Sequence, residues 1–275
     1  MIHYFVEGGI TPLRTTRKPK YEIDHFFPEL APYRKKTIRL HPVRITGSMQ
    51  TPPPVPRELL CEEHQEPLIP ILQLANADYP EIDFPDGRSL LRIVWCPRDH
   101  GEIYEPYVKA YWGSSSEQNP WNSAISLNPE TVIEYPHMED LLAMNEPLAH
   151  SIMEWQEELG EEDEEDEAIY EYQLSVADGT KVGGYVNWIQ FDETPTCHCS
   201  NAMEHLLTLS EAEFDGGTYS RWCPEELGDV WNLPYQERAV LQSPLGVSLG
   251  DMGKIYVFIC HTCTSKPLQT VFQCS

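Results

Sequence analysis

Short strand-like segments recur along the chain, and they restrict its fold more than any other feature of the sequence. The segment 255–259 is apolar on both faces, so we expect it to form a central strand that is covered on both sides. The 24 prolines and 16 glycines suit many short elements with irregular connections. The sequence therefore predicts a β-rich α+β fold. The predicted strands are residues 36–45, 68–75, 90–96, 107–112, 131–135, 184–190, 206–210, 254–260 and 268–274.

One amphipathic helix is predicted between these segments. Asn145 is a favourable N-cap, and Pro147 falls inside the first turn, where proline is tolerated. A helix that begins here has one apolar face, which we expect to be buried. That face carries Leu148, Ile152, Trp155 and Leu159.

A run of acidic residues follows the helix and divides the chain. Residues 157–167 include nine Asp or Glu side chains, and a run of like charge usually stays solvated. We interpret residues 160–167 as an acidic linker, although an acidic contact for a basic partner and a metal-binding tract are alternatives. The predicted parts are a basic and proline-rich segment, residues 1–56, packed on an N-terminal repeat, residues 57–159, and after the linker a C-terminal repeat, residues 168–275.

The division into repeats is based on a similar series of segments in each half. In the first half, an apolar segment precedes a turn at residues 85–87 and a strand that ends in Cys96. In the second half, an apolar segment precedes a turn at residues 250–253 and a strand that ends in Cys260. One supersecondary unit used twice would produce this series, although two β-rich halves can also resemble each other by chance.

The cysteines suggest a metal site in the C-terminal half. Cys197-x-Cys199 and Cys260-x-x-Cys263 supply four thiolates, the number that a closed tetrahedral zinc site needs. We therefore predict a structural zinc ion bound by these four residues. Two alternatives are ordinary buried cysteines and a redox pair at positions 260 and 263. Substitute ligands would be His198, His261 and Cys274.

The N-terminal half offers a second set of ligand-type side chains, Cys61-x-x-His64 and Cys96-x-x-x-His100. The residues between Cys96 and His100 suit a turn equally well, and the segment 61–64 could begin a solvated helix. The sequence therefore favours the C-terminal group as the metal site.

The balance of charge limits the classes of partner. The chain has 44 acidic and 19 basic side chains and a formal net charge of −25. A protein that follows a phosphate backbone needs a basic surface, so we expect no nucleic-acid partner. No segment approaches ~18 consecutive apolar residues, and the N-terminus lacks the pattern of a secretory signal. We therefore expect a cytoplasmic protein that does not enter a membrane and that attracts a basic protein or peptide.

The sequence identifies no catalytic residue. It contains no Gly-x-Ser-x-Gly elbow, no His-Glu-x-x-His pair and no phosphate-binding Walker loop. An enzyme with a cleft between the two repeats is nevertheless an alternative. In such an enzyme, carboxylates or His100 and His205 would act as acid–base groups.

Several segments, in their order along the chain, resemble the bacterial YwqG-like family, a family of unknown function. The resemblance spans about residues 60–275. Val186 stands where the family commonly has proline. The segments that carry the resemblance are residues 90–100, 181–190, 197–199, 203–207 and 250–258.

The resemblance implies a duplicated, β-rich α+β domain. The wider group is similar to the ribosomal-protein chaperones of the programmed-cell-death-protein-two type, and some YwqG-like members occur beside toxin systems. The resemblance therefore implies an acidic protein-binding module of chaperone or immunity type, without an established catalytic residue. A structural zinc protein without catalysis is a further alternative.

Overall fold

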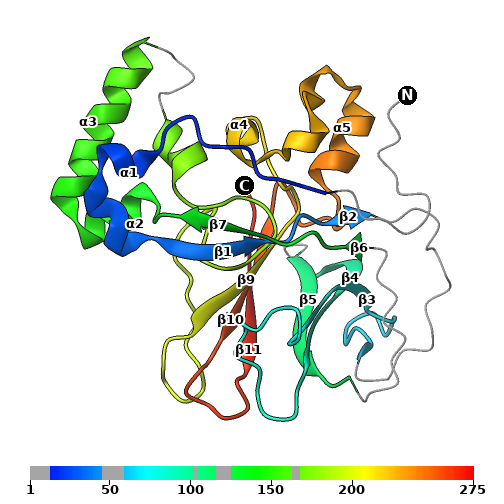
Figure 1. Cartoon of the computed structure of the whole chain (residues 1–275). Coiled ribbons are helices and arrows are strands. Elements are labelled where there is room, and N and C mark those ends of the chain that lie inside the picture. The colour runs from blue at the N-terminus through cyan, green and yellow to red at the C-terminus, as the bar shows by residue number, and fades with distance from the viewer. Residues whose placement is uncertain (1–12, 45–58, 102–104, 116–124, 163–167) are drawn as a thin grey trace.

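The computed structural model describes residues 13–44, 59–101, 105–115, 125–162 and 168–275. Within these ranges the fold is mixed α/β with open sheets, and more residues lie in strands than in helices, which agrees with the predicted β-rich class. The proline-rich segment 51–56 lies outside the described residues. Figure 1 shows the helices on one side of the molecule and most of the strands on the other.

The largest sheet has six antiparallel strands in the order β11-β10-β9-β8-β1-β7. Strand β1 therefore joins strands that come before and after the acidic run, with β7 on one side and β8 on the other. The strands are β1 (Lys35–Arg39), β7 (Glu130–Glu134), β8 (Lys181–Gly183), β9 (Glu204–Ser210), β10 (Lys254–Ile259) and β11 (Leu268–Gln273).

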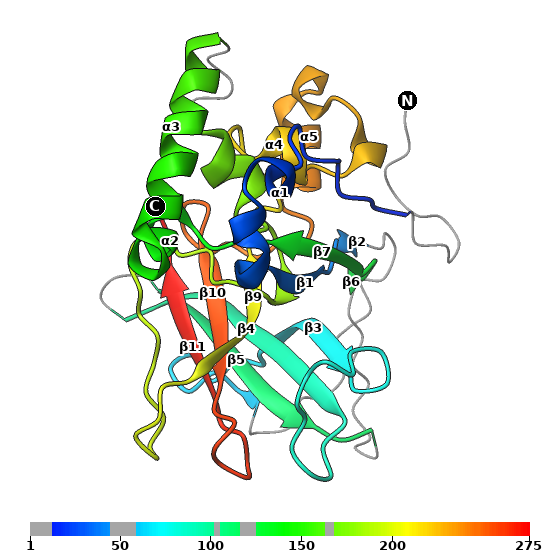
Figure 2. The ribbon, with the colours of Figure 1, turned by 60° about the vertical axis from the view of Figure 1, so that its left-hand side comes forward.

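A second sheet of three antiparallel strands packs against one end of the first. It consists of β3 (Ile69–Ala75), β4 (Leu90–His100) and β5 (Glu105–Gly113). Figure 2 shows these strands beside β9, β10 and β11. A short pair, β2 (Val43–Arg44) and β6 (Ile125–Ser126), forms a separate two-stranded ladder.

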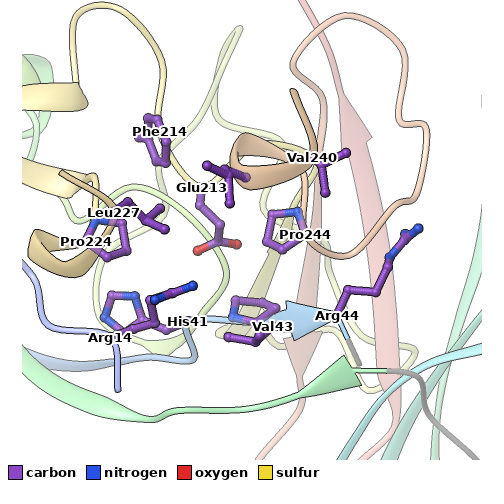
Figure 3. Close-up of a pocket in the computed structure, with 12 residues that line it drawn as sticks. Arg14, His41, Val43, Arg44, Glu213, Phe214, Pro224, Leu227, Val240 and Pro244 are labelled. Carbon is purple, nitrogen blue, oxygen red and sulfur yellow. The ribbon is translucent and has the colours of Figure 1, made fainter. Parts of the chain in front are cut away.

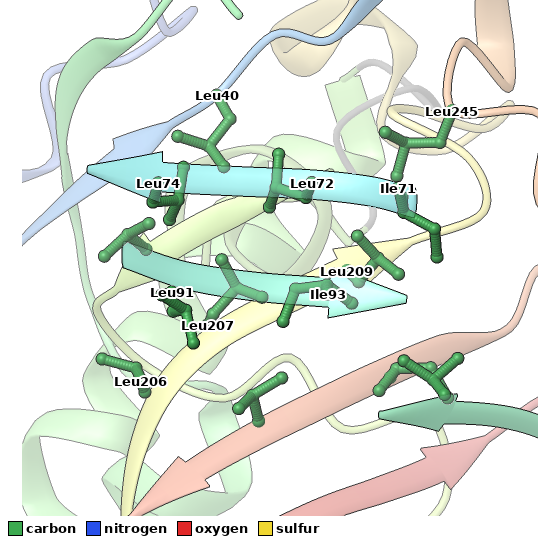
Figure 4. Close-up of a cluster of buried hydrophobic side chains, with 14 of the residues drawn as sticks. Leu40, Ile71, Leu72, Leu74, Leu91, Ile93, Leu206, Leu207, Leu209 and Leu245 are labelled. Atoms are coloured by element: carbon green, nitrogen blue, oxygen red, sulfur yellow. The ribbon is translucent and has the colours of Figure 1, made fainter. Parts of the chain in front are cut away.

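The main apolar core lies between these two groups of strands. Leu72 and Ile93 project from β3 and β4, and Leu207 and Leu209 project from β9 on the opposite side (Figure 4). All four side chains are at most 1% exposed. Burial of such a side chain stabilises the fold by about 1.5–3 kcal/mol, so the core holds the two sheets together.

The predicted helix is confirmed as α3 (Glu146–Glu162), and Asn145 caps it through a 3.3 Å hydrogen bond that its Oδ1 accepts from the Leu148 N–H. The predicted face packs into a second apolar cluster. The helix continues three residues into the predicted linker, and residues 163–167 lie outside the described ranges. The other helices are α1 (Ile23–Phe26), α2 (Met138–Met144), α4 (Tyr219–Trp222), α5 (Tyr235–Gln242), the 3-10 helices η1 (Pro28–Tyr33), η5 (Glu225–Leu227) and η6 (Val230–Asn232), and the π-helical turn η4 (Tyr170–Leu174).

Two of the nine predicted strands differ from the structure. The predicted strand 36–45 is divided into β1 and β2, because His41 has φ 40° and breaks the extended backbone. The predicted strand 184–190 is wrong, since the strand ends at Gly183 and the following residues are irregular. Gly183 and Gly184 have φ of 71° and 75°, which end the extended conformation.

Charged side chains are buried beneath the middle of the six-stranded sheet. Lys181 Nζ lies 2.8 Å from Glu134 Oε2, and both side chains are fully buried. Beside them, the Arg39 guanidinium donates hydrogen bonds to the Asp178 carbonyl at 3.0 Å and to the Trp222 carbonyl at 3.0 Å. Pairing and hydrogen bonding of this kind are what make buried charge tolerable. None of the helices within the described ranges has both the length and the apolar character to cross a bilayer.

Candidate metal centres

The four cysteines predicted as zinc ligands lie together. Cys197 and Cys199 come from the loop before β9, and Cys260 and Cys263 follow the end of β10. The Sγ atoms of Cys197 and Cys263 are 3.8 Å apart, and those of Cys199 and Cys260 are 3.6 Å apart. A zinc ion with Zn–S bonds of about 2.3 Å has tetrahedral S–S edges of about 3.8 Å. These four residues, here named the C-terminal group, could therefore hold a metal ion.

A closed loop positions the first two of these cysteines. Thr196 and Ala202 form an isolated antiparallel bridge, and inside it the Cys197 N–H donates to the Asn201 carbonyl at 2.9 Å. Ser200 has φ 69°, which reverses the chain directly after Cys199. A tight turn of this kind directs the two sulfurs toward the same point, next to the end of β10.

The surroundings of the C-terminal group favour ionised sulfur at one position. The Asn201 side chain donates a hydrogen bond to Cys199 Sγ at 3.3 Å. This bond, together with one from the Asn201 backbone, lowers the pKa of Cys199 to about 6. By contrast, the neighbouring thiols, first that of Cys199, raise the pKa of Cys263 to about 12. Four adjacent sulfurs therefore do not ionise together at neutral pH unless a cation balances their charge.

The predicted substitute ligands are placed differently. His198 lies beside the C-terminal group, with Nδ1 3.5 Å from Cys197 Sγ and Nε2 3.7 Å from Cys263 Sγ, and its side chain is exposed. His261 instead contacts Asp83, with its Nδ1 2.9 Å from the carboxylate. Cys274 lies next to Gly250.

A second group of ligand-type side chains also converges, although the sequence did not favour it. Cys61 and His64 lie before β3, and Cys96 and His100 lie in the last part of β4. One ligand atom of each lies within 4.8 Å of the others, so this N-terminal group could also hold a metal ion. The segment after Cys96 does not form the turn that we considered, because β4 continues to His100. Both groups follow the same order along the chain: two ligand-type residues, two strands and two further ligand-type residues. This shared order is the sequence signal that could have favoured the N-terminal group.

Both groups are suited to a structural role. Each offers four protein ligands, and a tetrahedral ion with four protein ligands has no open position for water or substrate. An ion bound in this way would join a loop to the end of a distant strand. It would stabilise the fold and would not activate a nucleophile.

The two histidines considered as acid–base groups do not form a pair. His100 belongs to the N-terminal group, whereas His205 Nε2 lies 2.9 Å from Thr208 Oγ1 in β9. Burial, with the nearby charge of Lys181, lowers the pKa of His205 to about 3. His205 is therefore neutral at physiological pH and is a poor proton donor.

Figure 3 shows a pocket into which the Glu213 carboxylate points, between the apolar side chains of Phe214, Leu227 and Val240. Its free volume is about 40 Å³, far below the roughly 300–1,000 Å³ of ligand sites. It is too small for a substrate.

A larger cavity of about 460 Å³ lies between the π-helical turn and the loops around β10. Its lining includes a polar chain in which His137 contacts Glu171, and His137 Nε2 lies 3.0 Å from Asn187 Oδ1. The chain continues from Asn187 to Asp178, whose Oδ1 lies 3.0 Å from Lys254 Nζ. This cavity is lined from the six-stranded sheet and its loops rather than from β3, β4 and β5, so it is not the inter-repeat cleft that we considered.

The resemblance to the YwqG-like family rests on the quoted segments alone. Comparison of the chain with protein-family models and with curated proteins gives no match.

Proposed function

We propose that this chain is an acidic protein-binding module of chaperone or immunity type that holds a basic protein or peptide. The observation that carries the proposal is the distribution of charge. Among the described residues, five cationic side chains are buried but only three acidic ones. The buried cations are Arg39, Arg92, Lys181, Arg221 and Lys254, and the buried acids are Glu134, Asp178 and Glu213.

This distribution makes the surface more acidic than the sequence total suggests. The net charge of −25 already includes these buried cations, which are unavailable to a partner. An acidic surface attracts cationic polypeptides and accelerates their association, and salt weakens that attraction. A basic polypeptide is therefore the class of partner that fits the chain.

Binding of defined peptides tests the proposal. We expect a fluorescent peptide rich in lysine and arginine to bind the full chain, and a rise from 50 to 300 mM salt to weaken binding by about tenfold or more. A peptide of the same length with glutamate in place of the basic residues is the matched control and should not bind. No binding of the basic peptide at 50 mM salt, or binding that salt does not change, would overturn the proposal.

We also propose that the C-terminal group binds a structural zinc ion. The matching sulfur distances and the convergence of all four sulfurs within 4.8 Å support this proposal. Because metal binding would then contribute to folding, Cys260→Ser or a chelator should lower the melting temperature by about 10 °C or more. Cys274→Ser, outside both groups, is the control. A melting temperature unchanged by both the C260S substitution and the chelator would contradict the zinc site.

The duplicated unit and membership of the YwqG-like family are also proposals. Each half of the chain contains a three-stranded antiparallel meander, β3-β4-β5 in the first and β9-β10-β11 in the second. Each meander has a ligand pair before its first strand and another at the end of its second strand. One ancestral unit used twice would explain this arrangement.

The cavity of about 460 Å³ favours a different enzyme alternative from the inter-repeat cleft, because it brings His137, Glu171 and Asp178 to one polar surface. If it binds a substrate, some small molecule in a metabolite library should raise the melting temperature of the protein, and His137→Gln should abolish that effect. A library without any stabilising compound, or a compound that stabilises H137Q equally, would contradict this alternative.

A further inference from the structure

We infer that Cys61, His64, Cys96 and His100 form a second zinc site, so that the folded chain binds two zinc ions at equivalent places. This inference does not depend on the proposed protein partner. It is argued from ligand geometry, from the loop that carries the first two ligands, and from strand register.

The distances within the N-terminal group match a tetrahedral ion. His64 Nδ1 lies 3.5 Å from Cys61 Sγ and 3.6 Å from Cys96 Sγ. The two ring nitrogens, His64 Nδ1 and His100 Nε2, are 3.2 Å apart, and His100 Nε2 lies 3.0 Å from Cys61 Sγ. Zinc bond lengths imply S–N edges of about 3.6 Å and N–N edges of about 3.3 Å. Three of these four distances lie close to the expected edges, and the fourth is shorter.

The loop that carries the first two ligands is built like the loop before β9. Leu60 and Pro67 form an isolated antiparallel bridge, and inside it the Cys61 N–H donates to the Glu66 carbonyl at 2.8 Å. Gln65, directly after the second ligand, has φ 55°. The bridge, the hydrogen bond from the first cysteine and the left-handed residue after the second ligand are the same three features that position the first two sulfurs of the C-terminal group.

Strand register relates two ligands of one group to two ligands of the other. Each meander has a bulge in its first strand, since the pairing of β3 with β4 skips Ile71 and the pairing of β9 with β10 skips Leu206. A bulge shifts all later pairing and re-aims the side chains around it, so it is a natural reference point for comparing two sheets.

Counted from the bulge, the two inner ligands of each group occupy matching positions, and the two outer ligands are offset by one residue. His64 and Cys199 each lie seven residues before the skipped residue. On the second strand, Cys96 and Cys260 each lie three residues beyond the residue that is paired directly after the bulge. Two unrelated hairpins have no reason to place ligand-type side chains at the same register positions. A metal-binding framework that both meanders share would place them there.

The two sites should differ in how firmly they hold zinc. Asn201 supports a sulfur of the C-terminal group by a hydrogen bond. In the N-terminal group, the buried His100 Nδ1 has no hydrogen-bond partner among the described residues. Because such outer partners orient metal-bound imidazoles and strengthen their binding, we expect the N-terminal site to release zinc first.

Metal content and X-ray absorption of the purified full chain test the inference. We expect about two zinc ions per chain and an average of three sulfur and one nitrogen ligands per zinc, because six thiolates and two imidazoles are shared between two ions. This measurement needs no variant, so it does not depend on whether a variant folds. One zinc per chain with four sulfur ligands would overturn the second site and leave the C-terminal site intact.

Cys96→Ser and Cys260→Ser form a matched pair, since both cysteines are 1% exposed and occupy matching positions. The C96S variant should keep about one zinc with four sulfur ligands, and C260S should keep about one zinc with two sulfur and two nitrogen ligands. Cys274→Ser should keep both ions. A C96S variant that retains two zinc ions would contradict the inference, and a hydrogen-bonded cluster without metal would then explain the N-terminal group.

Discussion

At the scale of single residues, the Glu134 carboxylate is the most demanding point in the fold. It is fully buried, and it accepts hydrogen bonds from the Ala177 N–H at 2.8 Å and from the Tyr185 N–H. Gly184 allows the chain to approach this carboxylate, because a Cβ at this position would overlap Glu134 Oε1. Its φ of 75° also favours glycine. Close packing therefore explains Gly184, and a positive φ of 71° explains Gly183, without a ligand loop.

Gly184→Ala should destabilise the protein by about 2–4 kcal/mol, because it adds both backbone strain and a clash with Glu134. Urea unfolding measures this loss. Gly216→Ala is the control, since its added methyl would meet no atom within 4 Å, and it should change stability little. Equal effects of the two substitutions would contradict the packing argument.

Glu213 should make stability depend on pH. Burial raises its pKa to about 7 in the folded chain, from 4.5 in an ordinary environment. Since the folded state holds this proton more tightly, the stabilising contribution is complete below about pH 4.5 and is lost as pH rises through about 7. The loss is on the order of 3 kcal/mol, even though the nearby charge of Arg39 opposes the shift and that of Asp178 adds to it.

Glu213→Gln removes this titration. The stability of the variant relative to the parent should therefore increase between pH 5 and pH 8 in urea unfolding. The exposed Glu225→Gln is the control and should show no such trend. A difference between E213Q and the parent that stays constant over this range would contradict the assignment.

Sequence spacing favoured one of the two candidate metal groups over the other, for a physical reason. Two Cys-rich pairs supply four sulfurs and indicate a site without any knowledge of the fold. The pairs Cys61/His64 and Cys96/His100 carry mixed ligands and resemble ordinary turn residues. They become as strong a candidate only when β4 is seen to continue to His100 and the register of both meanders is known.

At the scale of elements, seven of nine strands and the main helix could be predicted, because apolar alternation and an N-cap are local signals. The strand at 184–190 could not. Gly183 and Gly184 look permissive in the sequence, but their positive φ values end the strand, and β8 is only three residues long. Lys181, the first residue of β8, pairs with Glu134 in β7, and local sequence patterns cannot reveal a partner so distant in the chain.

Lys181→Met should cost about 3–5 kcal/mol, because it leaves the buried Glu134 charge without its cation. The double variant with Glu134→Gln should recover part of this loss. Denaturant unfolding of the two single variants and the double variant measures the coupling. Additive losses would show that the two side chains do not stabilise each other.

At the scale of the whole molecule, the predicted halves share one sheet. Strand β1 connects β7 with β8, and the apolar core packs strands from both sides of the acidic run. The sequence could not show this, because pairing between distant strands leaves no local pattern. Strands from before and after the acidic run therefore share the six-stranded sheet, whereas β3, β4 and β5 form a sheet of their own.

Because of this shared sheet, we expect a single cooperative unfolding transition. Denaturation followed by circular dichroism and by tryptophan fluorescence should give coincident curves. Separate transitions for the two halves would mean that β1 contributes little to their coupling.

The place of β1 also bears on synthesis. Residues 35–39 leave the ribosome long before residues 181–183, and at ordinary rates the interval is on the order of ten seconds. Throughout that time the edge of β1 that later pairs with β8 is unpaired. An unpaired strand edge is a site at which nascent chains aggregate. The sequence of β1, Lys-Lys-Thr-Ile-Arg, carries three cationic side chains. Their charge opposes such aggregation until β8 pairs with this edge.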